Sequence, residues 1–268
     1  MKIPSLRIYA IAYLVFLYTP IVILPIFAFN NATVIAFPLR GFTTDWFVAV
    51  WQDVELRGAL INSLIVAAST SVLATTFGVF AARASTRYNF RAKGPLMGLI
   101  MLPMVLPEMI LAMALLVVLL SLGIKLSLFT VILGHVLVCT PFSVAILSSA
   151  FQSLDKSLEE AAYDLGEGPV STFRLVILPL VLPGIISSLL ITFTISLDEF
   201  IISNFLKSGE ELLSTYIYSK LRFPKYVPNI MALGTILVGV SIMLLALAEY
   251  FRRRGLAKTG GKNTGGFL

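Results

Sequence analysis

Three carboxylates stand inside long apolar stretches of the sequence: Glu108, Asp198 and Glu199. An ionisable side chain within a membrane span is costly unless it faces protein or water, so each is a candidate functional residue. Carboxylates at that depth can bind a cationic solute through charge-assisted hydrogen bonds that offset the desolvation of its ammonium groups. They can equally pair with a basic residue or hold helices together, and both readings stay open. Neighbours on one helix point about 100° apart, which indicates different roles; we prefer Asp198 for a transport path and keep Glu199 and Glu108 as further candidates for it.

The remaining reactive side chains do not form a catalytic set. The sequence has one histidine, His135, and one cysteine, Cys139, both inside an apolar run. An intramembrane enzyme would need a nucleophile with a base, or a metal cluster, and no paired motif of that kind is present. There is also no G-x-x-x-x-G-K-[ST] phosphate loop, because Leu256 stands where Gly261-Lys262 would need its first glycine. The sequence therefore predicts a non-catalytic chain with no metal or cofactor of its own.

The stretch 152–182 is polar by comparison with its flanks and carries a short amphipathic pattern. Its apolar residues follow helical spacing at i, i+3, i+4 and i+7: Leu158, Ala161, Ala162 and Leu165. Asp155 is placed to cap the start of this helix, and Gly166 is placed to end it. Small side chains on such a stripe let the helix approach a groove of another protein closely, although a helix lying on the surface of its own chain would show the same pattern.

A second short helix is predicted at about 170–178, before Pro179 and Pro183 start a new helix into the membrane. The stretch 152–182 is therefore expected to form two small helices outside the bilayer.

The composition indicates that most of the chain lies in a membrane. Of the 268 residues, 58% are hydrophobic and 13% are charged, and the mean hydropathy is +0.94. A soluble domain could not cover so much apolar surface, and a membrane span needs about 20 apolar residues. The sequence thus predicts an all-α integral membrane protein with one domain over residues 1–254. Six helices are expected to span the membrane, at about 8–29, 58–82, 96–122, 127–151, 183–206 and 227–250. Pro103 and Pro107 are expected to kink the third of them.

The basic residues predict the orientation. A net charge of +6 could indicate nucleic acid, but these charges lie at the termini and in short loops, which is typical of topology signals. The connection after the second span carries four basic residues and no carboxylate: Arg83, Arg87, Arg91 and Lys93. We therefore place this connection, the stretch 152–182 and both termini in the cytoplasm. This basic tract either only sets the topology or also contacts lipid or a partner. The glycine-rich tail 255–268 is expected to be disordered.

The 152–182 stretch resembles a known motif. Glu160-Ala161-Ala162, Gly166 four residues later, and then Val176, Leu178 and Pro179 are similar to the EAA loop of permease subunits of bacterial ATP-binding-cassette importers. Isoleucine is usual where Val176 stands. The resemblance implies contacts with an ATPase by the following residues: Glu160, Ala161, Ala162, Asp164, Leu165, Gly166, Leu178 and Pro179.

The resemblance extends over most of the chain, towards the PotC-type permeases of spermidine and putrescine importers. It rests on four further segments: Gly41 to Trp46, Asn62-Ser63-Leu64, Leu102 to Glu108, and Ser196 to Glu199. Trp46 matches an aromatic residue of those permeases, which implies contact with the solute or its binding protein, although a tryptophan can also anchor a loop at the membrane interface. Glu108 and Glu199 stand where aspartates are expected, so opines, other amino-acid derivatives and ferric ion remain alternative substrates.

The family resemblance implies a type I importer (MetI-like) permease fold, with the EAA helix as a cytoplasmic coupling helix. The chain would form half of a translocation path for a small cationic solute in a bacterial cytoplasmic (inner) membrane. Its implied partners are a homodimeric ATPase that holds the ATP and Mg, a second and different permease chain, an external solute-binding protein and membrane lipid, without nucleic acid. An ATP-independent carrier or channel is a more remote alternative, since no internal repeat is evident.

Overall fold

The computed structural model describes residues 3–240, 242 and 243. Over these residues the chain is helical, with a single isolated bridge between Asn30 and Phe42 and no named strand. It divides into two compact units, residues 54–216 and the residues before and after them (1–53 and 217–268). The all-α prediction is confirmed. The last part of the predicted sixth span and the tail 255–268 lie outside the described residues.

The unit formed by the chain ends contains α1 (Ile3–Ala28), α2 (Asp45–Gln52), the end of α11 (Leu213–Leu221) and η2 (Pro224–Tyr226). A further helix runs from 227 to at least 240. Between α1 and α2, ring contacts join Phe29 to Phe42 at 5.1 Å and to Phe47 at 4.8 Å between centroids. These aromatic contacts organise a connection that contains little regular structure.

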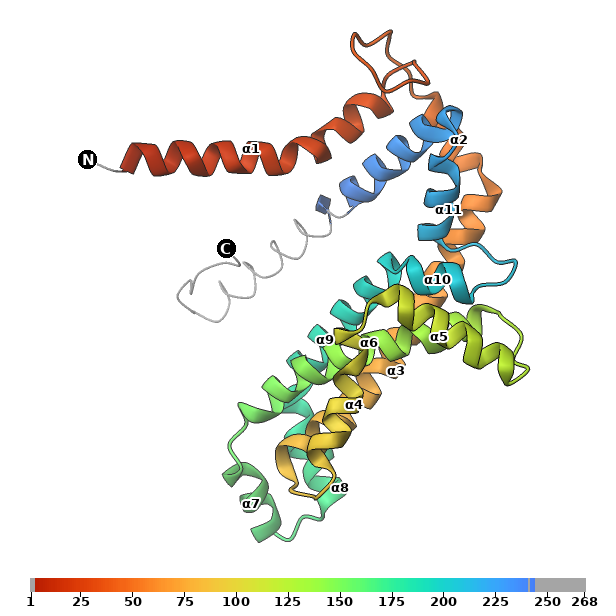
Figure 1. Ribbon diagram of the computed structural model, residues 1–268. Coiled ribbons are helices and arrows are strands. Elements are labelled where there is room, and N and C mark those ends of the chain that lie inside the picture. Colours follow the sequence, from red (N-terminus) through yellow and green to blue (C-terminus); the bar gives the residue numbers. More distant parts are fainter. Residues whose placement is uncertain (1–2, 241, 244–268) are drawn as a thin grey trace. The chain divides into compact units, whose positions relative to one another are not determined.

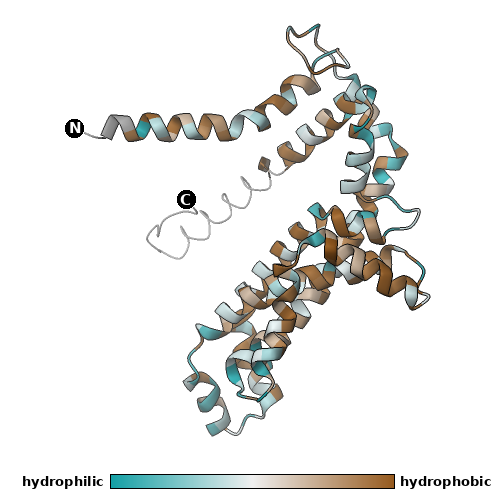
Figure 2. Cartoon of the chain, in the orientation of Figure 1, coloured by the Kyte–Doolittle hydropathy of each residue, from teal (hydrophilic) through white to brown (hydrophobic). Residues whose placement is uncertain are grey.

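The central unit is built on three helices that pack along one another: α3 (Val54–Arg87), α6 (Leu128–Gln152) and α9 (Leu178–Asp198). Figure 1 shows them as an elongated bundle with α7 (Ser157–Asp164) at one end. Hydrogen bonds between hydroxyl groups join all three helices inside the bundle. Ser188 Oγ on α9 lies 3.0 Å from Thr75 Oγ1 on α3 and 2.8 Å from Ser143 Oγ on α6. Figure 2 shows apolar residues along the long helices and hydrophilic residues gathered at α7.

The third predicted span is broken rather than kinked. It forms α4 (Lys93–Val105) and α5 (Glu108–Ser121), which meet at an angle of 110°. Pro103 lies within α4 without ending it, whereas Leu106 is extended with ψ 143°. A residue that precedes proline avoids the helical region, so Pro107 ends α4 and α5 begins in a new direction.

The second short helix expected at 170–178 does not end before the membrane span, and that expectation is wrong. Helix α8 (Pro169–Thr172), a π-helical turn η1 (Phe173–Ile177) and α9 are continuous, so the chain passes through Pro179 and Pro183 as helix. The wider turn, in which Leu178 N–H donates to the Phe173 carbonyl, shifts the hydrogen-bond pattern just before Pro179, whose nitrogen has no proton to donate.

The fifth predicted span also has a break. Helix α9 ends at Asp198, Glu199 is extended with ψ 114°, and α10 runs from Ile201 to Leu206. Four helical stretches are long and apolar enough to cross a membrane, and the α4–α5 pair makes five if it is counted as one span. The predicted count of six is therefore not reached within the described residues.

Candidate functional site

Asp155 binds the start of α7, although the residue directly before the helix is Lys156, whose side chain makes no capping bond. The Asp155 carboxylate accepts a hydrogen bond of 3.0 Å from the Ser157 backbone N–H, at the first residue of the helix. This bond to the charged form holds the pKa of the Asp155 carboxyl below its ordinary value. The cap therefore stays ionised at neutral pH and satisfies one of the free N–H groups of the first turn.

Gly166 ends α7, and its backbone explains why a glycine is needed. Its φ is +88°, a left-handed conformation that residues with a Cβ rarely adopt. The Gly166 N–H donates to the Tyr163 carbonyl at 2.9 Å, and the Glu167 N–H donates to the Ala162 carbonyl at 3.0 Å. This pair of bonds is a Schellman motif, so the predicted end of the helix is confirmed.

The apolar stripe of α7 is largely uncovered. Ala162 is buried, whereas Leu158 is 43% exposed and Leu165 85% exposed. Ala161, Glu160 and Asp164 are exposed as well. One small residue thus packs inward, and the rest of the stripe faces away from the part of the chain that the structure describes. An uncovered apolar surface on so short a helix is typical of a protein–protein contact.

Two arginines hold α7 in this position. Arg87, the last residue of α3, donates from Nε to Glu159 Oε1 at 2.7 Å and from an Nη atom to the Leu154 carbonyl at 3.0 Å. Arg83 lies 3.9 Å from the other Glu159 oxygen and stacks on the Phe173 ring at 4.6 Å. The tract was predicted to set topology, or also to contact lipid or a partner. The contact with Glu159 was not predicted, although Arg83 and Arg87 stand four residues apart on one helix face.

The other two residues of the proposed EAA loop lie elsewhere. Leu178 and Pro179 open α9, directly after the π-helical turn. They are continuous with the bundle, while Glu160 to Gly166 form the exposed helix and its end. The predicted ATPase-contact residues therefore fall into two groups, one in and just after α7 and one at the start of α9.

The two helix breaks lie close together because α5 packs against α10. Glu108 is the first residue of α5 and is exposed, and Glu199 stands in the gap between α9 and α10. Each break therefore carries a carboxylate, on elements that pack against each other. Carboxylates can bind a positively charged group through charge-assisted hydrogen bonds.

Asp198 and Glu199 have different surroundings. Asp198 ends α9 and is exposed, whereas Glu199 is only 9% exposed. One Glu199 carboxylate oxygen accepts the Ile202 N–H at 2.9 Å, which caps the first turn of α10. Because the helix stops between them, the helical spacing used to separate their roles does not apply here.

His135 packs within the protein beside this break. It is fully buried, and its two ring nitrogens lie 2.7 Å from Ser196 Oγ on α9 and 2.9 Å from Ser203 Oγ on α10. Within the described residues no three potential ligands gather around a possible metal ion. His135 therefore bridges the two helices across the break.

Trp46 holds the connection between α1 and α2. Its indole N–H donates to the Asn30 carbonyl at 2.9 Å, and the Asn30 side chain accepts the Arg40 N–H at 3.0 Å. Asn30 is 1% exposed, and its Nδ2 has no hydrogen-bond partner. Trp46 itself is half-buried, so part of the ring remains open to a ligand or partner.

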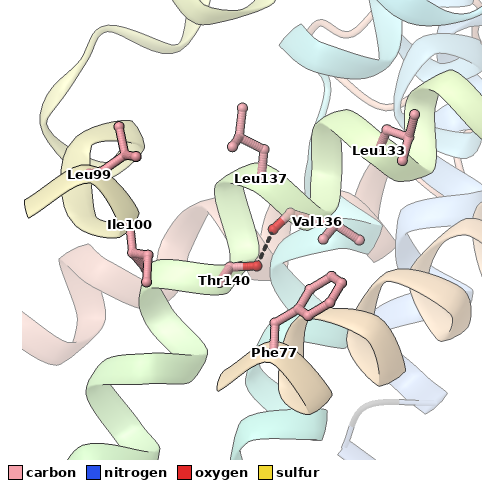
Figure 3. Close-up of a pocket in the computed structure, with 7 residues that line it drawn as sticks. All are labelled: Phe77, Leu99, Ile100, Leu133, Val136, Leu137 and Thr140. Atoms are coloured by element: carbon pink, nitrogen blue, oxygen red, sulfur yellow. Dashed lines mark hydrogen bonds between the residues drawn. The ribbon is translucent and has the colours of Figure 1, made fainter. Parts of the chain in front are cut away.

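A cavity of about 330 Å³ lies between α3, α4 and α6. Figure 3 shows it lined by Phe77, Leu99, Ile100, Leu133, Val136, Leu137 and Thr140. Its one hydroxyl, Thr140 Oγ1, already donates to the Val136 carbonyl at 2.6 Å. With no charged group in its lining, this cavity does not match a cationic solute.

Known proteins are similar to this chain over most of its length. The spermidine/putrescine transport system permease protein PotC of Haemophilus influenzae is 33% identical over 89% of this chain and 93% of that protein. PotC of Escherichia coli K12 is 33% identical over 93% of both chains. The putrescine transport system permease protein PotI of E. coli K12 is 32% identical over 89% of this chain and 87% of that protein.

Solved structures share the fold at lower identity. A bacterial transporter for the acidic polysaccharide alginate has a TM-score of 0.69 and 16% identity, over 93% of this chain and 97% of that chain. Another structure, of a bacterial alginate transporter in complex with an alginate pentasaccharide-bound periplasmic protein, has a TM-score of 0.70 and 20% identity over 94% and 93%. The model of one family, the binding-protein-dependent transport system inner membrane component, matches residues 74–255. With that match and three relatives above 30% identity, the chain belongs to this family of multi-pass permease proteins.

Proposed function

We propose that this chain is the permease subunit of an ABC importer, forms half of the path for a polyamine such as spermidine or putrescine, and couples to a separate ATPase through residues 152–182. The observation that carries the proposal is α7 itself, a capped helix whose apolar stripe is uncovered while Glu159 and Ala162 hold it to its own chain. A helix fixed in place with an open apolar face is ready to enter a groove on a partner.

The ATPase contact is assigned to the exposed part of the loop. Glu160, Ala161, Asp164 and Leu165 present the surface, and Ala162 and Gly166 set its position and end. Leu178 and Pro179 join the loop to α9. Closure of two ATPase subunits would carry the docked helix with it and switch the path between inward and outward access. ATP and Mg belong to that partner, and this chain has no catalytic role.

A polyamine substrate is supported by the relatives and by charge. PotC and PotI are named for spermidine and putrescine transport. Glu108 begins α5 and Glu199 precedes α10, two helices that pack against each other, and Asp198 is exposed beside Glu199 in sequence. We assign these three carboxylates to the path, and Trp46 to a contact with the solute or its binding protein. An ammonium group between the carboxylates would relieve their repulsion.

The remaining partners follow from the same class. A fold neighbour was solved with a solute-bound periplasmic protein, which supports a solute-binding protein here. We further propose a second, different permease chain, a bacterial inner-membrane location and cytoplasmic termini, with Arg91 and Lys93 on the cytoplasmic side.

Reconstitution tests the function and the substrate together. The chain is assembled in lipid vesicles with its sister permease, ATPase and binding protein, and ATP hydrolysis and uptake are measured. We expect spermidine and putrescine to stimulate ATP hydrolysis and to be taken up. Vesicles that lack the ATPase should show neither hydrolysis nor uptake. Stimulation by an opine or by ferric ion alone would replace the polyamine assignment within the same importer class. Uptake that needs no ATPase would contradict the importer proposal and favour a carrier.

A further inference from the structure

Helix α3 is held by polar contacts at its last residue, Arg87, and about two turns after its first residue, at Asn62 and Ser63. It runs without a break from Val54 to Arg87. One end reaches the α7 loop, and the other reaches the connection that follows α10. The two sets of contacts, at Asn62 and Arg87, are separated by roughly 37 Å along the helix at about 1.5 Å per residue.

The contacts at the α7 end are short and largely shielded from solvent. The Arg87 and Glu159 side chains are 10% and 14% exposed, and they are joined at 2.7 Å. Arg87 also donates to the Leu154 carbonyl, so its planar guanidinium contacts one residue within α7 and one residue just before it. A fork of this kind fixes direction as well as distance.

The contacts at the opposite end join α3 to residues 211–213. The Asn62 side-chain amide donates to the Glu211 carbonyl at 3.0 Å, and the buried Ser63 hydroxyl accepts the Leu213 N–H at 2.7 Å. The next residue, Ser214, donates from its hydroxyl to the Glu199 carbonyl at 3.0 Å. These bonds therefore lead from α3 to the break that carries Glu199.

The middle of α3 is packed too closely to bend independently. A Cβ added at Gly78 would lie 2.8 Å from Ser143 Cβ on α6, and Thr75 is bonded to Ser188 on α9. Close packing of this kind resists deformation and transmits displacement.

We propose that α3 is a rigid transmission element that carries the movement of α7 to the Glu199 break, with Arg87 and Asn62 as positioning residues at its two ends. The inference rests on the proposed function, since α7 must be moved by an ATPase. It assigns to Arg83 and Arg87 a role in energy coupling as well as any role in topology. The ATPase would thereby act on the carboxylate site through α3 in addition to α9, which is continuous with the loop and ends at Asp198.

The first experiment breaks and rebuilds the contact at the α7 end. Arg87→Ala is compared with Arg91→Ala in vesicles that contain the sister permease, ATPase and binding protein, using spermidine as the probe. Arg91 is an exposed basic residue of the same connection. We expect Arg87→Ala to lower uptake per ATP hydrolysed by about tenfold, within the usual range of coupling between sites, and Arg91→Ala to leave it unchanged. Arg87→Lys keeps the charge but cannot reproduce the fork that binds both Glu159 and Leu154, so it should recover only part of the loss. Equal coupling in Arg87→Ala and wild type would overturn the proposal.

A cross-link tests rigidity even if Arg87→Ala folds poorly. Cysteines replace Arg87 and Glu159 in a Cys139→Ala background, and a reducible bifunctional thiol reagent joins them in the assembled complex. If α7 and α3 move as one body, uptake persists with the link in place. If α7 has to move relative to α3, the link abolishes uptake and reduction restores it, which contradicts the proposal.

The opposite end needs its own variant. Asn62→Leu keeps the approximate size of the side chain but removes the bond to Glu211. We expect the complex to bind the ATPase and hydrolyse ATP as wild type does, while uptake of spermidine per ATP falls several-fold. Unchanged uptake per ATP would show that this end transmits nothing. A wild-type chain that fails to bind any ATPase would instead refute the proposed function, so the two failures are distinguishable.

Discussion

His135 on α6 and Ser203 on α10 lie 2.9 Å apart, and the other His135 nitrogen lies 2.7 Å from Ser196 on α9. One buried imidazole thus joins the two helices on either side of the break at Glu199. The Ser203 hydroxyl also donates to the Glu199 carbonyl at 2.8 Å, which satisfies a backbone group that the break leaves without a helical partner. The break is therefore stabilised by specific hydrogen bonds and is not a frayed helix end.

Replacing His135 by Ala is expected to destabilise the protein by about 2–4 kcal/mol, because two buried serine hydroxyls lose a partner and a cavity is left. His135→Gln, which keeps hydrogen-bonding groups at the site, should lose less. Thermal unfolding of the detergent-purified chain measures both variants. An alanine variant as stable as wild type would contradict the bridging role.

Removing the charge of Glu199 or Glu108 is expected to weaken solute binding. Glu199→Gln keeps an oxygen that can accept the Ile202 N–H, so the cap of α10 survives while the charge is lost. We expect KM for spermidine uptake to rise about tenfold in either single variant, the effect of losing one hydrogen bond to a charged group. Glu210→Gln, an exposed carboxylate on the connection after α10, is the matched control. Unchanged KM in both Glu108→Gln and Glu199→Gln would remove these carboxylates from the path.

Asp198 needs a separate experiment because its surroundings differ. It is exposed at the end of α9, and Asp198→Asn changes its charge while keeping its shape. We expect a rise in KM for spermidine of several-fold in intact cells. If affinity and rate both stay at the wild-type level, Asp198 does not line the path, and solute binding is left to Glu108 and Glu199.

Gly166→Val is expected to unseat the end of α7. No atom lies within 4 Å of a Cβ added there, so the effect comes from the backbone, whose φ of +88° strains a β-branched residue. ATPase association, measured by co-purification, should fall at least several-fold with a strain of about 1–2 kcal/mol. Gly168→Ala is the control, because Gly168 has an ordinary φ of −80° and open space around it. Normal association and transport in Gly166→Val would show that α7 is not the coupling helix.

Gly78→Ala tests the packing that stiffens α3. The added methyl group would meet Ser143, with its Cβ at 2.8 Å, so α3 and α6 must separate. We expect a loss of about 1–3 kcal/mol in stability, as for other overpacked cores. Gly98→Ala, where no atom lies within 4 Å, should be neutral or slightly stabilising, since alanine favours helix over glycine. Equal melting temperatures for wild type and Gly78→Ala would indicate that the bundle yields easily.

Features that depend on neighbouring residues were predictable from the sequence. The apolar runs indicated the long helices, and Asp155 and Gly166 marked the ends of α7, because caps and left-handed glycines act within one turn of helix. Pro107 marked a distortion for the same reason, although the 110° bend between α4 and α5 is larger than the kink expected.

Only the tertiary structure decided the contacts between distant segments. Arg87 and Glu159 are 72 residues apart in the sequence, and the breaks at Glu108 and Glu199 belong to one region only because α5 packs on α10. From the sequence, Asp198 was separated from Glu199 by their angle on one continuous helix, whereas in the structure the helix ends between them, with Asp198 exposed and Glu199 buried. Local propensity cannot determine such pairings, because each depends on which helix faces satisfy one another's apolar and polar groups when the bundle packs.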